Sequence, residues 1–175
     1  RARNQGFALE ARRIGAHARS TEEAKPGGTP MLIAHVLRDK GAVVHTLSVS
    51  ATLEEAAREL EARRVGALVV IDENGAIIGV FSERDLVREI ARRGCAALSN
   101  TAVHDAMTRN VITAHVDETI DEGLARMTDR RVRHLPVVDG EGGLIGIVSI
   151  GDLVKHRIAV AEAEAAAMQA YIAAH

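Results

Sequence analysis

Aromatic residues are scarce in this sequence: they make up 2% of its 175 residues, and tryptophan is absent. Proteins that hold single-stranded nucleic acids usually stack the bases on several aromatic side chains, and this chain has only one Tyr and two Phe. General nucleic-acid binding is therefore not expected. The hydrophobic content of 47% is ordinary for a globular protein, so the core must be built mainly from aliphatic side chains.

Cysteine pairs and long apolar runs are also missing. Cys95 is the single cysteine, so the chain can form neither an intrachain disulfide nor a thiolate metal cluster, which suits a reducing compartment. No apolar run approaches the roughly 18 residues of a membrane span, and the net charge of −2 gives no overall attraction to DNA or anionic membrane. The eight His residues lack the short spacings of metal ligands. We expect a cytoplasmic protein with no metal site and no membrane association.

Residues 1–30 differ in composition from the rest of the chain. Arginine is interleaved there with small apolar residues, and the run Lys-Pro-Gly-Gly-Thr-Pro at 25–30 would break any helix. We interpret 1–30 as an N-terminal extension and linker. A targeting sequence, a short helix, a disordered tail and residues left by cloning are all open interpretations of it.

The remainder of the chain contains an internal repeat. Residues 44–88 match residues 111–155 at a constant shift of 67, and 18 of the 45 pairs are identical. Upstream the shift becomes 70, which pairs Ile33 with Val103 and Leu37 with Met107. A repeat of this length indicates two copies of one structural unit. The predicted organisation is a first repeat at 31–98, a second repeat at 99–158 and a C-terminal helical extension at 159–175.

Both copies predict the same order of elements. A short extended run, at 43–49 and 111–116, leads to a Thr-x-x-Glu capping box at Thr52 or Thr119, and an amphipathic helix follows. Two β-rich runs separated by a turn come next, and a last helix begins at a Ser in each copy. The predicted fold is α+β, with two β-α-β-β-α units. We expect them to pack sheet to sheet with pseudo-twofold symmetry, because an apolar sheet face is too large to leave in water.

The last helix of the second copy continues to the end of the sequence. Its apolar residues recur with alternating spacings of four and three, as in a short coiled coil: Val154, Ile158, Ala161, Ala165, Met168 and Ile172. Such a seam needs a partner surface. We interpret it as a homodimer contact, with packing on the chain's own N-terminal segment as the alternative.

Four segments strongly resemble the CBS (cystathionine-beta-synthase) domain family: RVGALVV at 64–70, IGVFSERDL at 78–86, RHLPVV at 133–138 and IGIVSIGDL at 145–153. The resemblance covers about 31–158 and is specific, because a whole order of elements recurs twice. It implies a stand-alone tandem CBS module of the Bateman type. In that family two repeats bind adenosine ligands in clefts between them, and modules commonly pair into homodimers. The implied ligand is AMP, with ADP, ATP, NAD(H) and S-adenosylmethionine as alternatives.

The start of the last helix in each copy offers groups that suit a nucleotide. Asp85 and Asp152 lie there, where the helix dipole favours a carboxylate that can accept two hydrogen bonds from a ribose diol. The hydroxyls of Ser82 and Ser149 stand beside free helix amides and suit a phosphate. The same Ser-x-x-Asp pattern is also an ordinary helix cap. Gly79 and its counterpart in the second copy reduce bulk where a ligand or a neighbouring strand approaches.

The resemblance adds positions around the same clefts, where Thr46 and Thr113 are matched to cleft-lining residues. The two copies differ at Arg84 and at the pair Arg133-His134, which replaces Gly-Ala, so the clefts cannot have equal electrostatics. Arg133 and His134 suit a phosphate or simple surface solvation. The candidate nucleotide-binding residues are Thr46, Val65, Ala67, Ser82, Arg84, Asp85, Thr113, Val132, Arg133, His134, Pro136, Ser149 and Asp152.

These observations predict a regulatory sensor module that binds adenine nucleotides and signals to a downstream protein that the sequence does not name. No Walker loop, dinucleotide fingerprint or catalytic constellation occurs, so an enzyme is not expected. The alternative is a ligand-independent homodimerisation scaffold.

Overall fold

The computed structural model describes residues 8–9 and 30–174, which form two compact units. The first unit holds 43–113 together with 8–9, and the second holds 30–42 together with 114–174. The expectations for 1–30 therefore lie almost entirely outside the described residues, and the repeat boundaries at 31–98 and 99–158 stay predictions.

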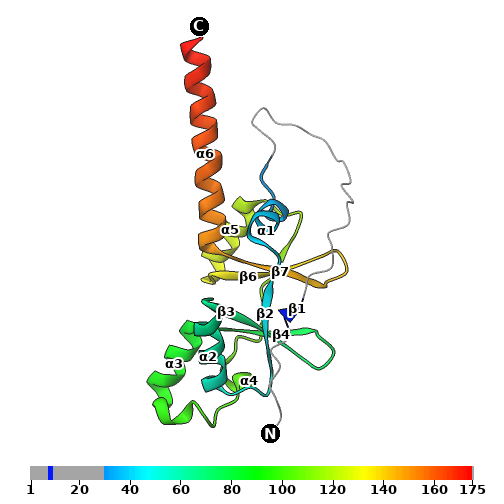
Figure 1. The fold of residues 1–175 in the computed structure, drawn as a ribbon, viewed down its shortest axis with the longest axis vertical. Coiled ribbons are helices and arrows are strands. Elements are labelled where there is room, and N and C mark those ends of the chain that lie inside the picture. Colours follow the sequence, from blue (N-terminus) through cyan, green and yellow to red (C-terminus); the bar gives the residue numbers. More distant parts are fainter. Residues whose placement is uncertain (1–7, 10–29, 175) are drawn as a thin grey trace. The chain divides into compact units, whose positions relative to one another are not determined.

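The first unit is built on a sheet with the strand order β1-β2-β3-β4 (Figure 1). Strand β2 is parallel to β3, and β3 is antiparallel to β4. Helix α2 packs against β3, and α3 packs against β4 and α2. In chain order the elements are β1 (Ala8–Leu9), β2 (Val44–Ser48), α2 (Leu53–Arg63), β3 (Ala67–Ile71), β4 (Ile77–Ser82), α3 (Glu83–Arg93), a short 3-10 turn (Cys95–Ala97) and α4 (Val103–Ala106).

The second unit repeats this plan with a three-stranded sheet of order β5-β6-β7. Its parallel pair is β5 with β6, and its antiparallel pair is β6 with β7. Helix α6 contacts α5, α1 and β7. In chain order the elements are α1 (Ile33–Lys40), β5 (Ala114–His115), α5 (Ile120–Arg130), β6 (His134–Val138), β7 (Leu144–Ser149) and α6 (Ile150–Ala173).

The predicted capping boxes fix where the second helix of each unit begins. In α2, Glu55 N donates to Thr52 Oγ1 at 3.2 Å, and Thr52 N donates to the Glu55 carboxylate at 2.8 Å. Thr119 and Glu122 form the same pair at 3.2 and 2.8 Å at the start of α5. These reciprocal bonds satisfy amides that have no partner inside the helix.

A buried aliphatic core holds each unit together. In the first unit Leu53, Leu68 and Val70 are almost fully buried, and Phe81 is the one aromatic side chain among the buried residues that the structure describes. This composition agrees with the aliphatic core expected from the scarcity of aromatic residues.

The first helix of each predicted repeat packs in an exchanged manner, in the other repeat's unit. Helix α1 lies at the start of the predicted first repeat but belongs to the second unit, where it contacts β7 and α6. Helix α4 lies near the start of the predicted second repeat but belongs to the first unit, where it contacts β4 and α3. Neighbouring residues are anchored in matching ways: Val103 N donates to Ala51 O at 2.7 Å, and Ile33 N donates to Glu118 O at 2.8 Å.

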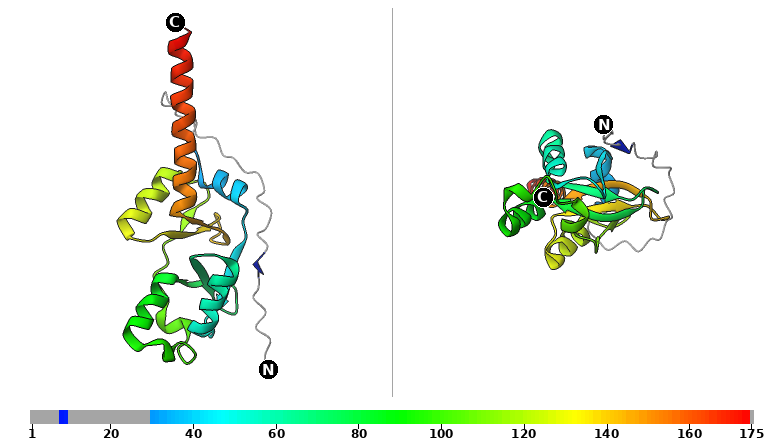
Figure 2. Two further views of the ribbon diagram at one scale, coloured as in Figure 1. Left: turned by 60° about the vertical axis from the view of Figure 1, so that its left-hand side comes forward. Right: turned by 90° about the horizontal axis from the view of Figure 1, so that it is seen from below.

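The α+β fold with two β-α-β-β-α units and a long C-terminal helix is confirmed. Helix α6 has 24 residues and runs well beyond the sheet of its own unit in the left-hand view of Figure 2. The strand expected at 111–116 was wrong in length, because β5 contains only Ala114–His115. Glu118 N donates to His115 O at 3.1 Å, so the chain turns directly after β5. The pseudo-twofold packing of the two units stays a prediction.

Candidate functional site

In the first unit, the predicted Ser-Asp pair lies at the start of α3. The Asp85 Oδ2 atom accepts hydrogen bonds from Ser82 N at 3.0 Å and from Ser82 Oγ at 2.7 Å. Its other oxygen, Oδ1, accepts from Arg88 Nη1 at 3.0 Å, and the Asp85 side chain is only 6% exposed. Both carboxylate oxygens of Asp85 are thus engaged by residues of the first turns of α3.

The equivalent pair in the second unit lies at the start of α6. Asp152 Oδ2 accepts from Ser149 N at 2.8 Å and from Ser149 Oγ at 2.7 Å, as in the first unit. The third donor differs, because it comes from another element: Lys40 Nζ, at the end of α1, lies 2.6 Å from the same oxygen. Lys40 Nζ also donates to Ile147 O at 3.2 Å.

The two carboxylates consequently differ in whether an oxygen remains open to accept a hydrogen bond from a ligand. Within the part of the chain that the structure describes, Asp152 Oδ1 accepts no hydrogen bond, and the Asp152 side chain is 26% exposed. Asp85 has no such open oxygen. Asp152 is therefore the better placed of the two to accept hydrogen bonds from a sugar diol.

The charge on Asp152 is stabilised by its neighbours. Burial alone would raise the pKa of the Asp152 carboxyl, but the hydrogen bonds from Lys40 and Ser149 and the charge of Lys40 outweigh burial and lower that pKa. The group is therefore an acceptor over the physiological pH range.

Ser149 acts as a helix cap, because Asp152 N donates to Ser149 Oγ at 3.2 Å, so the capping interpretation of the Ser-x-x-Asp pattern is confirmed in the second unit. In the first unit Ser82 occupies the N-cap position of α3, and its amide and hydroxyl both donate to Asp85. A contact of Ser82 or Ser149 with phosphate stays a prediction.

Several of the other predicted residues lie beside these helix starts. Ala67 pairs with Ser82 across β3 and β4, and His134 pairs with Ser149 across β6 and β7. Ile150 N donates to Arg133 O at 2.9 Å, which holds the chain before β6 against the start of α6. The structure thus brings His134 and Arg133 next to the Ser149-Asp152 pair.

The remaining predicted positions are spread more widely within the units. Thr46 is buried in β2, where it pairs with Val69, and β3 therefore separates it from β4. Thr113 precedes β5 and is half-buried. The other candidates divide by exposure: Val65 and Val132 are half-buried, Pro136 is buried, and Arg84 is exposed. Whether any of these residues contacts a ligand stays a prediction.

Side chains of the two exchanged segments, Met107 and Leu37, pack against the two glycines that precede the serines. A Cβ on Gly79 would lie 2.3 Å from Met107 Sδ, and a Cβ on Gly146 would lie 2.6 Å from Leu37 Cδ2. The close approach expected at these glycines is therefore made by protein side chains, from the segments that the shift of 70 had paired.

Two charged residues of the site were missed by the sequence interpretation. Arg88 lies three residues after Asp85 on one helix, a spacing that predicts an ion pair. Lys40 lies 112 residues from Asp152, so no local spacing reveals that contact. The shift of 70 does show an asymmetry, because it aligns Lys40 with the uncharged Asn110.

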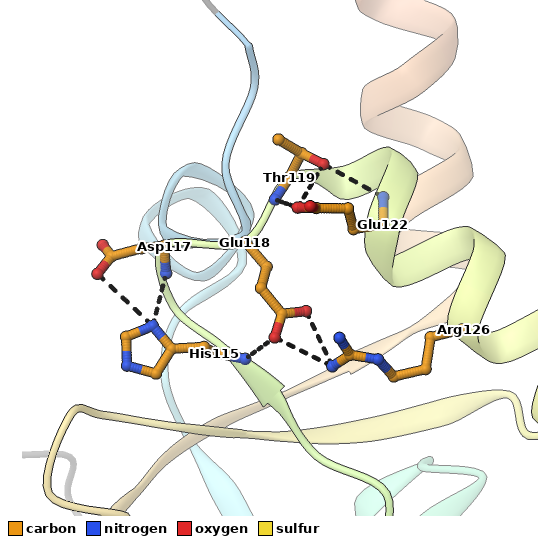
Figure 3. Close-up of polar contacts among 6 residues, drawn as sticks. All are labelled: His115, Asp117, Glu118, Thr119, Glu122 and Arg126. Carbon is orange, nitrogen blue, oxygen red and sulfur yellow. Dashed lines mark hydrogen bonds and ion pairs between the residues drawn. The ribbon is translucent and has the colours of Figure 1, made fainter. Parts of the chain in front are cut away.

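A further polar cluster surrounds the turn between β5 and α5 (Figure 3). Arg126 Nη1 lies 3.0 and 2.9 Å from the two carboxylate oxygens of Glu118, which also accepts from His115 N at 3.0 Å. The Asp117 carboxylate lies 3.5 Å from His115 Nδ1. These contacts close the turn and leave no acidic trio around a common centre. Among all described residues, no three His, Cys, Asp or Glu side chains come together as metal ligands.

The fold consists of two α+β repeats, and each repeat has a Ser-Asp pair at the start of its last helix. The family model of the CBS domain matches residues 41–92 and 103–159, so the chain belongs to the CBS domain family. Stand-alone CBS domain proteins of this kind are regulatory modules and generally not enzymes. None of the described helices has the length and apolar character needed to cross a membrane.

Solved structures of CBS proteins resemble this chain closely. A CBS-domain-containing protein from Agrobacterium tumefaciens is 42% identical, with a TM-score of 0.70 over 73% of this chain and 99% of that chain. The CBS domain pair of protein MJ0100, solved with 5'-methylthioadenosine and S-adenosyl-L-methionine, is 26% identical, with a TM-score of 0.62 over 73% and 95%. CBSX2, solved with AMP, is 25% identical, with a TM-score of 0.61 over 74% and 98%.

The curated relatives are longer than the matched region. The match spans 66%, 57% and 60% of the length of three of them, and 24% of an L-aspartate semialdehyde sulfurtransferase. Activities of such longer proteins therefore say nothing direct about this chain.

Proposed function

We propose that this chain is a regulatory module that senses an adenine nucleotide, with AMP as the first candidate and with ADP, ATP, NAD(H) and S-adenosylmethionine as alternatives. The observation that carries the proposal is the carboxylate of Asp152. It is ionised, it is oriented by Ser149, and it keeps one oxygen open to solvent. A carboxylate held in this way suits a ribose diol, which needs a fixed acceptor for two hydroxyl donors. The similarity to CBS pairs solved with AMP and with 5'-methylthioadenosine supports an adenosine-containing ligand.

The same geometry favours the second unit as the stronger site. A ligand at Asp85 would have to displace Arg88, whereas a ligand at Asp152 finds Oδ1 already open. Arg133 and His134 lie beside the second site only, so they add donors for a phosphate there.

Binding of a panel of adenine compounds tests this proposal directly. AMP, ADP, ATP, NADH and S-adenosylmethionine are screened by thermal shift, because a ligand that binds only the native state raises the melting temperature. Asp152→Asn should abolish most of the shift and Asp85→Asn should reduce it less. If none of the five compounds shifts wild type, or if neither substitution weakens a compound that binds, the proposed site is wrong. In the former case the ligand-independent scaffold becomes the better account.

We further propose that the module is a homodimer and that α6 contributes to its interface. The seam residues Ile158, Met168 and Ile172 are between 53% and 68% exposed. With these residues at the a and d positions, Arg157 falls at g and Glu162 at e, five residues apart. A parallel second copy would therefore place opposite charges together twice, and Arg157, whose Nε lies 3.2 Å from Asp121 Oδ1 of the same chain, would lie between two carboxylates there.

Light scattering tests the dimer. The full chain should have the mass of two copies at micromolar concentration, and Ile158→Glu with Met168→Glu should weaken association. Arg157→Glu should weaken it as well, and adding Glu162→Arg should restore it. A monomeric mass for the full chain, unchanged by these substitutions, excludes the seam.

We also propose that the protein works in the cytoplasm. Cys95 is exposed and is the only thiol of the chain, a usage that suits a reducing compartment. Fractionation of cells that express the full-length protein checks this location.

A further inference from the structure

Lys40 differs from every other charged group at the two helix starts, because it reaches Asp152 from a separate helix. Its ammonium group has three donors, and two of them have protein partners, at Asp152 Oδ2 and Ile147 O. Among the described residues no acceptor takes the third donor, and the side chain is 35% exposed. Lys40 therefore has a donor available to a solute that approaches Asp152.

The contacts that seat Lys40 show that its position is built into the second unit. Leu37, one turn earlier on α1, is 1% exposed and packs into the space above Gly146. Asp39 Oδ2 lies 4.0 Å from His156 Nδ1 of α6, the helix that carries Asp152. Helix α1 thus packs against both β7 and α6, and Lys40 extends from its last residue on a flexible stem.

Among the described residues, no cation from another element contacts Asp85 in the first unit. Asn110 takes the place of Lys40 in the alignment of the two copies, and the cation on Asp85 is Arg88 of the same helix. The second unit therefore combines an acceptor for a sugar diol with a positive charge from another element, and the first unit does not.

We propose that Lys40 determines the charge specificity of the second unit, by favouring adenosine ligands with a 5'-phosphate over uncharged and cationic adenosine ligands. This inference rests on the proposed function. A ribose bound to Asp152 carries its 5'-substituent on the same ring, and Lys40 is the cation that contacts this carboxylate. A phosphate there gains a charge-assisted hydrogen bond from Lys40. A neutral substituent gains none, and a sulfonium is repelled by the ammonium group.

Three ligands that share adenosine and differ in charge give the test: AMP, 5'-methylthioadenosine and S-adenosylmethionine. Their dissociation constants are measured by calorimetry on the full chain carrying Asp85→Asn, which leaves the second unit as the site under study. With Lys40 present, AMP should bind most tightly and S-adenosylmethionine most weakly. Lys40→Gln should weaken AMP about tenfold or more at low ionic strength and strengthen S-adenosylmethionine, because one charged hydrogen bond is lost and one repulsion is removed.

Two control variants keep the result specific. Arg38→Gln removes the same charge from an exposed position of the same helix and should leave the ligand order unchanged. Lys40→Arg keeps the charge and should preserve the preference for AMP, which guards against a mere loss of folding in Lys40→Gln.

The outcomes separate the two proposals. If the three compounds bind and Lys40→Gln leaves the ratio of their affinities unchanged, the role of Lys40 is wrong and the nucleotide-binding function stands. If none of them binds the chain with Lys40 in place, and AMP does not bind wild type, the proposed function fails and this inference fails with it.

Discussion

The contact between Leu37 and Gly146 positions α1, and it gives the sharpest test of how the second site is assembled. A Cβ added at Gly146 would lie 2.6 and 2.8 Å from the two terminal carbons of Leu37, which is buried and has little room to move. Overpacking of a core costs about 1–3 kcal/mol, and the better strand propensity of Ala offsets about 0.5–1 kcal/mol of that. Gly146→Ala should therefore destabilise the protein by about 1–2 kcal/mol.

Leu37→Ala provides the complementary change. On its own it should cost about 2–5 kcal/mol, because it leaves a cavity beside β7. In the double variant the methyl group that Gly146→Ala introduces fills part of that cavity, so the combined cost should be smaller than the sum of the single costs by about 1 kcal/mol or more.

Urea unfolding followed by far-UV circular dichroism is the suitable assay, since the chain has no tryptophan to report by fluorescence. Gly79→Ala is the matched control in the first unit. Its neighbour Met107 is half-buried and flexible, so that variant should cost less than Gly146→Ala. Additive costs for Gly146→Ala and Leu37→Ala, within about 0.5 kcal/mol, would refute the contact.

Three further predictions concern the second unit. Thr119→Ala should destabilise it by about 1 kcal/mol in the same assay, because the cap on Glu122 N is lost, and Thr119→Ser should restore most of that. Because the folded-state pKa of Asp152 lies below its ordinary value of 3.8, its contribution to stability is present above that pH and is lost as the pH falls through the folded-state pKa. The difference in melting temperature between wild type and Asp152→Asn should therefore shrink on acidification, and a constant difference contradicts this. Arg126→Met should cost about 1 kcal/mol, since it leaves Glu118 with the His115 amide alone, and a double-mutant cycle with Glu118→Gln should show the coupling.

The elements that the sequence predicted correctly are those specified by local patterns. The Thr-x-x-Glu boxes determine where α2 and α5 begin, because both partners of each box lie within one turn. The strand at 111–116 was overestimated because its residues have strand-forming character. The turn in which the Glu118 carboxylate accepts from His115 N accounts for its early end, but residues 111–113 lie before β5 and are not explained by that turn.

The candidate site was also predictable only in part. The Ser149-Asp152 pair was predictable, since a hydroxyl and a carboxylate three residues apart at a helix start bond to each other and to the backbone. The contact with Lys40, which distinguishes this pair from the Ser82-Asp85 pair, was not predictable, because it depends on the packing of α1 in the second unit. In the sequence, only the alignment of the two copies, which pairs Lys40 with Asn110, indicated this difference.

Exchanged packing also bears on how a ligand in one unit can affect more than its own pocket. A ligand shifts a conformational equilibrium only if it binds two arrangements with different affinity. At Asp85 the competing cation, Arg88, belongs to the same helix, so releasing it changes little beyond α3. At Asp152 the neighbouring cation, Lys40, ends α1, and the next residue, Gly41 with a φ of +90°, starts the short connection to β2 of the first unit. Under the proposed function, the second unit is therefore the one in which binding and the course of the chain between the units are linked.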